Sequence, residues 1–198
     1  MPISGVAELP QDQRSDDAYS VCFDDQPLTN ELDILGTTKV HLRLSSDCTC
    51  GMIAARLCDV APDGASTLIS YGMLNLKQRN GRERLTKITP NESIDVVIRL
   101  NDAGWSLKRK HKLRLALSTQ LWPMAWPVVE RATITLDLAH CYLELPVRNT
   151  DAASKMVNPF GPPVAADQLD TDVVVPPRAT RRVQNDVEKG QIVYEVHI

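Results

Sequence analysis

Residues 52–76 read MIAARLCDVAPDGASTLISYGMLNL, and this stretch decides the fold class. Two largely apolar runs, 52–60 and 67–76, flank the sequence Ala61-Pro62-Asp63-Gly64. Proline, aspartate and glycine favour a tight turn, and runs of this length bounded by turn residues are typical of strands. Because the runs are nearly continuous in apolar residues, we expect both to be covered on both faces. The stretch therefore predicts a central antiparallel pair of strands.

Outward from this pair, the chain alternates apolar and polar residues. A period of two indicates strands with one solvent-exposed face. The alternation occurs in residues 40–45, 94–100, 113–117, 134–138 and 143–147. Strands that are apolar on one face must bury that face against a second layer. The sequence therefore predicts an all-β fold built as a β-sandwich.

Four segments are expected along the chain. Residues 1–28 form an acidic, extended leader arm that lies along a surface, and residues 29–148 form the sandwich. Residues 149–171 are rich in proline and alanine, which predicts an extended connector. Alternation returns around Glu188-Lys189-Gly190, so residues 172–198 are expected to form a C-terminal β-hairpin.

Composition and charge exclude several classes of protein. With 198 residues, of which 43% are hydrophobic, the chain can bury a core without disulfides, and no cofactor or metal is expected. A net charge of −3 argues against a nucleic-acid partner, because affinity for phosphates needs a basic excess. No apolar stretch approaches the roughly 18 residues of a membrane span. Five cysteines, an odd number, without a recognisable signal peptide predict a cytoplasmic protein.

No catalytic residue is expected from the motifs. The chain lacks the Gly-x-Ser-x-Gly pattern of α/β-hydrolase nucleophiles. None of its four histidines has a sequence-adjacent partner that would mark a general base, so we expect them to be structural or exposed: His41, His111, His140 and His197. Cys48 and Cys50 project to one strand face, but a second ligand pair at zinc-site spacing is missing. Two free thiols are the favoured interpretation, and metal binding is the weaker one.

Two further groups of residues are open to alternative interpretations. The basic residues between 108 and 114 are interpreted as a solvated hairpin turn leading into a strand, rather than as a site for phosphate or an acidic partner. The segment 121–127, LWPMAWP, is predicted to be neither strand nor helix. Its rings, Trp122 and Trp126, either form a substrate rim or partner contact, or close one end of the core.

Several motifs carry a resemblance to a known family. In chain order they are Asp12-Gln13-Arg14, Arg56-Leu57-Cys58-Asp59-Val60, Pro62-Asp63-Gly64 and His111-Lys112-Leu113-Arg114-Leu115. Together they resemble the C-terminal domain of X-Pro dipeptidyl-peptidase and cocaine esterase-like serine hydrolases, over about residues 10–148. The resemblance implies a jelly-roll β-sandwich of the galactose-binding-like type. The family's catalytic serine, aspartate and histidine belong to an upstream α/β-hydrolase domain, so none has a counterpart here.

The resemblance implies a non-catalytic domain that packs on the α/β-hydrolase catalytic domain and shapes its substrate entrance. By itself the chain is expected to hydrolyse neither esters nor X-Pro amides. A free-standing carbohydrate- or peptide-binding module is the alternative. The expected partner surface combines the acidic arm from Glu8 to Asp25 with the loop 122–127, and a homodimer through that surface is left open. No nucleic-acid or membrane partner is expected.

Three residues are predicted to build the turn after the first strand of the central pair. Asp59 ends an apolar run just before the turn, so its carboxylate is expected to accept hydrogen bonds from backbone N–H groups of that turn. Asp63 and Gly64 supply the turn itself.

Overall fold

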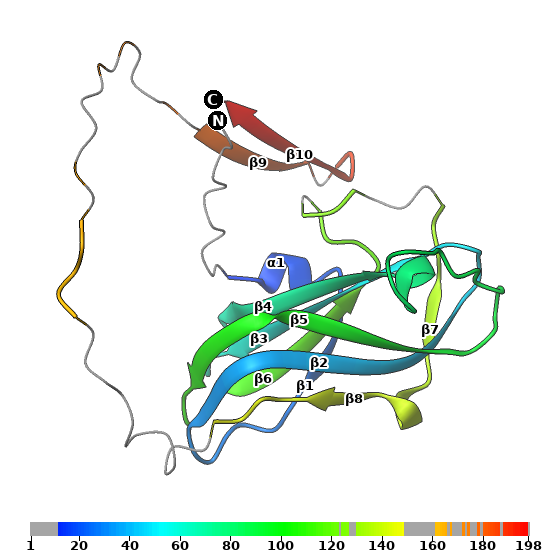
Figure 1. Ribbon diagram of the computed structural model, residues 1–198, viewed down its shortest axis with the longest axis horizontal. Coiled ribbons are helices and arrows are strands. Elements are labelled where there is room, and N and C mark those ends of the chain that lie inside the picture. Colours follow the sequence, from blue (N-terminus) through cyan, green and yellow to red (C-terminus); the bar gives the residue numbers. More distant parts are fainter. Residues whose placement is uncertain are drawn as a thin grey trace. The chain divides into compact units, whose positions relative to one another are not determined.

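The computed structural model describes residues 12–122, 124–126, 130–148, 161–165, 167, 172, 174, 178, 180–186 and 188–197. Antiparallel strands make up nearly all of its regular structure (Figure 1). The chain divides into two compact units, Met1–Ala152 and Ala153–Ile198. The prediction of an all-β sandwich is confirmed. None of the described helices is long and apolar enough to cross a membrane.

One sheet of the first unit has the strand order β1-β6-β3-β4. Its strands are β1 (Val21–Asp24), β6 (Lys112–Ser118), β3 (Met52–Val60) and β4 (Ser66–Asn75). The predicted antiparallel pair is confirmed as β3 and β4, with Met52 opposite Asn75 and Val60 opposite Ser66. Every residue of β3 is buried, whereas β4 ends the sheet and is covered only in part. The expectation that both strands are central and fully covered is therefore right for β3 alone.

The second sheet is organised around the long strand β2 (Leu32–Ser46). On one side β2 pairs with β5 (Ile94–Leu107), and on the other with β7 (Ile134–Leu136) and β8 (Tyr142–Glu144). Two short 3-10 helices, η1 (Leu76–Gln78) and η2 (Leu138–His140), interrupt the connections. All pairings in this sheet are antiparallel.

The core lies between the two sheets, which form separate layers in Figure 1. Alternate residues of each strand face this core because side chains of a strand point to opposite faces in turn. From β2, β5 and β3 the buried residues of this core are Ile34, Val40, Leu42, Leu44, Val96, Ile98, Leu100, Leu107, Ile53, Ala55 and Leu57. The opposite face of β3 therefore carries Ala54, Arg56 and Cys58, all of them buried as well.

The sequence predicted that the basic segment forms a hairpin turn, and this prediction is wrong. β5 and β6 lie in different sheets, so residues 108–111 carry the chain from one layer to the other. Lys110 adopts a positive φ of 71° in this crossing, and Lys108 Nζ lies 3.1 Å from Glu31 Oε1. Alternation shows which residues share a face, but it does not reveal which strand pairs with which.

The described part of the leader arm, from Asp12 onward, is not fully extended. Residues Arg14–Asp17 form a single helical turn, α1, in which Asp17 N donates to Gln13 O at 2.8 Å. β1 then adds a strand to the first sheet, with Val21 opposite Leu117. The described arm lies along that sheet. The prediction that the arm is extended is wrong at this helical turn. Residues 1–11 lie outside the described part.

The second unit contains the predicted C-terminal hairpin, which is confirmed. β9 (Thr180–Asp186) pairs antiparallel with β10 (Gln191–His197). Gly190 has a φ of 60°, a left-handed conformation that glycine adopts without strain. Of the predicted connector 149–171, only residues 161–165 and 167 are described, and the rest lies outside the described residues.

Candidate functional site

The leader arm is held to the outer face of the first sheet by the guanidinium group of Arg56. Its side chain is only 3% exposed, and Asp17 beside it is 6% exposed. Arg56 Nη1 donates to Gln13 Oε1 at 2.8 Å, and Nη2 donates to Ser20 Oγ at 3.0 Å. Nη2 also lies 3.0 Å from Asp17 Oδ1 as an ion pair. The arm therefore docks through one arginine of β3.

Arg114, on the neighbouring strand β6, binds two carboxylates of the same arm. Its Nη1 donates to Asp17 Oδ2 at 3.0 Å, and Nε and Nη2 donate to the two oxygens of Asp24 at 2.6 and 2.8 Å. The hydrogen bonds from Arg114 lower the pKa of Asp24. These two acids are thus neutralised inside the chain. The arm from Glu8 to Asp25 as part of a partner surface stays a prediction, but these two acids are already paired within the chain.

Asp59 does not cap the turn that follows its strand. Its Oδ2 accepts from Trp105 Nε1 at 3.0 Å and its Oδ1 lies 2.7 Å from His111 Nδ1, so the carboxylate binds two side chains from the crossing and the other sheet. Asp63 performs the predicted role instead, since its Oδ1 accepts from Ala65 N at 3.0 Å. Gly64 completes the turn with a φ of 89°. The bulge between Leu57 and Cys58 shifts the strand register just before Asp59.

The His111–Asp59 pair was not visible from the sequence, because 52 positions separate the two residues. A histidine paired with a buried carboxylate supplies two of the three members of a hydrolase triad. Within the described residues, however, no serine or cysteine side chain hydrogen-bonds to this histidine. The pair holds the crossing between the sheets together.

Replacing Asp59 by alanine is expected to lower the free energy of unfolding by about 1–3 kcal/mol, because Trp105 Nε1 and His111 Nδ1 lose their shared partner. Urea denaturation measures the loss. Asp63→Ala is the matched control, with a smaller expected loss because its turn is exposed. Equal losses in the two variants would contradict this assignment.

The two tryptophans of the loop after β6 pack against each other rather than inside the core. Trp126 is 83% exposed and Trp122 is 38% exposed. Their ring centroids are 5.4 Å apart at an interplanar angle of 66°, an edge-to-face contact. Met124 between them is also exposed. The loop therefore presents a small apolar surface to solvent.

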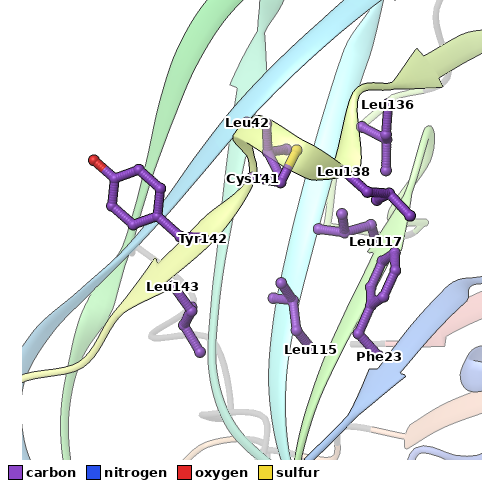
Figure 2. Close-up of a pocket in the computed structure, with 9 residues that line it drawn as sticks. All are labelled: Phe23, Leu42, Leu115, Leu117, Leu136, Leu138, Cys141, Tyr142 and Leu143. Atoms are coloured by element: carbon purple, nitrogen blue, oxygen red, sulfur yellow. The ribbon is translucent and has the colours of Figure 1, made fainter.

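An apolar cavity of about 260 Å³ opens between the edges of the two sheets (Figure 2). It is lined by Phe23, Leu42, Leu115, Leu117, Leu136, Leu138, Cys141, Tyr142 and Leu143. Figure 2 shows the Tyr142 hydroxyl pointing away from the leucines. The Tyr142 ring stacks on His41, with centroids 4.2 Å apart. Such a lining suits a hydrocarbon group and offers little to the hydroxyl groups of a sugar.

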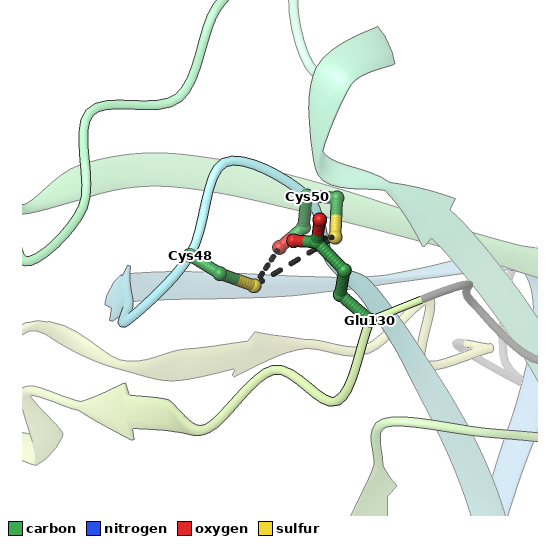
Figure 3. A group of neighbouring side chains, drawn as sticks. All are labelled: Cys48, Cys50 and Glu130. Carbon is green, nitrogen blue, oxygen red and sulfur yellow. Dashed lines mark hydrogen bonds between the residues drawn. The ribbon is translucent and has the colours of Figure 1, made fainter.

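One more group of side chains consists of residue types that bind metal ions. Cys48 and Cys50 lie in the loop between β2 and β3, and Glu130 approaches them from the segment before β7 (Figure 3). Their ligand atoms all lie within 4.8 Å of one another. Burial, together with the neighbouring Cys48 and Glu130, raises the pKa of the Cys50 thiol. No sequence motif pointed to Glu130, which is 80 positions from Cys50.

Residues 4–158 match the model of a protein family described as the X-Pro dipeptidyl-peptidase C-terminal non-catalytic domain. The chain belongs to this family. Cocaine esterase from Rhodococcus sp. (strain MB1 Bresler) is 26% identical over 116 residues, which are 58% of this chain and 20% of the esterase. The chain therefore spans about one fifth of the length of that curated relative.

Solved structures share the fold of this chain. An α-amino acid ester hydrolase labelled with selenomethionine matches with a TM-score of 0.65 and 22% identity, over 71% of this chain and 28% of its own. A CocE/NonD family hydrolase from Staphylococcus aureus matches with a TM-score of 0.56 and 15% identity, over 70% of this chain and 32% of its own. An aminopeptidase from a marine sediment Thaumarchaeota archaeon matches with a TM-score of 0.55 and 16% identity, over 59% of this chain and 21% of its own.

Most of the motifs that carried the family resemblance lie on or beside the first sheet. Arg56, from the Arg-Leu-Cys-Asp-Val run, binds Gln13 and Asp17 of the arm, and Asp59 of the same run binds His111. Arg114, from the histidine-led strand, binds Asp17 as well. The residues of these motifs thus make two sets of contacts, one around Arg56 and Arg114 and one between Asp59 and His111.

Proposed function

We propose that this domain packs on an α/β-hydrolase catalytic domain and shapes its substrate entrance. One observation carries the proposal: the chain matches a non-catalytic C-terminal domain and spans only 20% of its curated relative, a cocaine esterase. In this proposal the chemistry belongs to the other part of the hydrolase. The jelly-roll, galactose-binding-like classification and the cytoplasmic location are parts of the same proposal.

The loop with Trp122 and Trp126 supports a docking role. Large aromatic rings that are exposed in one domain and buried against another supply much of the free energy of an interface. An edge-to-face pair is also partly ordered before it binds, so less entropy is lost on docking. A carbohydrate-binding role draws no comparable support from the cavity, since its lining is apolar.

The test uses the α/β-hydrolase catalytic domain that this proposal expects to be encoded upstream of, or beside, the sequence. We expect the two purified parts to bind, and Trp126→Ala to weaken binding by about 30-fold, because truncating an interface tryptophan costs about 2 kcal/mol. Calorimetry gives the affinity. Turnover of a nitrophenyl ester is expected from the catalytic domain, with kcat or KM altered by the sandwich, and not from the sandwich alone.

Leu85→Ala is the matched control, because Leu85 is 66% exposed in a different loop, between η1 and β5. Its affinity for the catalytic domain should be unchanged. A Trp126→Ala protein that binds as tightly as the parent chain would rule out the loop as the contact. A chain that only self-associates would support the homodimer instead.

A further inference from the structure

We propose that Cys48, Cys50 and Glu130 bind a divalent cation of the zinc class, with two sulfur ligands, one carboxylate ligand and a water molecule. The proposal does not depend on the proposed contact with a catalytic domain, although Glu130 lies in the same connection between β6 and β7 as Trp126. It rests on the positions of the three ligand atoms and on the loops that hold them.

Two of the three distances between the ligand atoms match tetrahedral zinc. Zinc–sulfur bonds of about 2.3 Å at a tetrahedral angle place two sulfurs about 3.8 Å apart, and a sulfur and a carboxylate oxygen about 3.6 Å apart. In the structure Cys48 Sγ and Cys50 Sγ are 3.7 Å apart, and Cys50 Sγ and Glu130 Oε2 are 3.6 Å apart. These two distances match a tetrahedral zinc ion, and the third, between Cys48 Sγ and the Glu130 carboxylate, is within 4.8 Å, so a rotation of the exposed Glu130 side chain would complete the set.

Figure 3 shows the three side chains converging from two separate loops. Glu130 is exposed and both cysteines are half-buried, so water can reach the fourth coordination position. Three protein ligands with one water are the arrangement of zinc sites that keep an open position.

Hydrogen bonds around the ligands hold these loops in place. Ser46 Oγ accepts from Cys48 N at 3.3 Å and donates to Cys50 O at 3.1 Å, which fixes the turn that bears both thiols. Asp47 ties this turn to the segment of Glu130, because its Oδ1 accepts from Thr133 N at 2.8 Å and its N donates to Thr133 O at 3.2 Å. Outer contacts of this kind orient metal ligands and raise affinity.

The test is a zinc titration of the full, reduced chain against a competing chromophoric chelator. We expect binding of about one zinc ion per chain. Cys48→Ser and Cys50→Ser should each weaken binding by about 100-fold, and Glu130→Gln by about tenfold or more, since even outer-contact changes cost 10- to 100-fold. Cobalt in place of zinc should give sulfur-to-metal charge-transfer absorption and the visible bands of a tetrahedral site.

Cys141→Ser is the matched control, because Cys141 is also half-buried but contacts Asp137 and Arg43 instead, and its affinity should not change. Thermal melting shows whether each variant folds. The cobalt spectrum of the parent chain tests for sulfur ligands without the use of any variant. Absence of zinc binding, binding that survives loss of both thiols, or an affinity unaffected by Glu130→Gln would each overturn the proposed ligand set.

Discussion

Replacing Arg56 by alanine is expected to lower the free energy of unfolding by about 3–5 kcal/mol, the cost of removing one partner from a buried ion pair. The guanidinium lies between β3 and the leader arm, and its loss leaves the Asp17 carboxylate, only 6% exposed, with Arg114 as its remaining cation. Gln13 Oε1 and Ser20 Oγ lose their hydrogen-bond donor in the same step. Urea denaturation followed by circular dichroism measures the change.

Arg43→Ala is the matched control for this experiment. Arg43 also donates two hydrogen bonds to one aspartate, Asp95, but that carboxylate is 70% exposed. Exposed ion pairs contribute about 0–1 kcal/mol, so this variant should remain close to the parent chain. If the two alanine variants unfold at the same urea concentration, the arm is not held by Arg56. Asp17→Ala in the Arg56→Ala background should add less than it does alone, because the two residues share one interaction.

Replacing Gly72 by alanine is expected to cost about 2–3 kcal/mol of the free energy of unfolding, within the usual range for overpacking a core. Gly72 lies in β4, where the edge of the first sheet meets β5 of the second. A Cβ atom there would lie 2.5 Å from Arg99 O and 3.0 Å from Leu100 Cδ2. The carbonyl belongs to the backbone of β5 and cannot rotate away. The two strands must therefore separate, which also strains the 2.6 Å bond from Ser70 Oγ to Asn101 O.

Gly104→Ala tests whether any glycine-to-alanine change in a strand of this sandwich has that effect. At Gly104, in β5, a Cβ atom would meet only Leu35 Cδ1 at 3.6 Å, an ordinary contact. Alanine in a permitted conformation loses less backbone entropy on folding, so this variant should be neutral or slightly more stable. Thermal melting of both variants gives the comparison. A Gly72→Ala protein as stable as Gly104→Ala would show that the sheets are not packed closely at this corner.

The sequence was sufficient for features that depend on neighbouring residues. Period-two alternation located the strands, and Pro62-Asp63-Gly64 located the turn between β3 and β4, because strand faces and turn conformations are set by residues a few positions apart. The motifs of the family resemblance and the hairpin turn at Gly190 are likewise short stretches of neighbouring residues. The catalytic-domain contact through Trp122 and Trp126 stays a prediction, although both rings are exposed as that contact requires.

Tertiary structure decided which distant segments meet. The basic crossing at 108–111 passes between sheets, Asp59 binds His111 rather than its own turn, and Glu130 joins Cys48 and Cys50. Each outcome depends on strand order and register. Alternation says which face a side chain occupies, but many pairings of the same strands bury the same apolar faces. Only the packing of two complete sheets selects one pairing, and with it the partners of Arg56, Asp59 and Cys50.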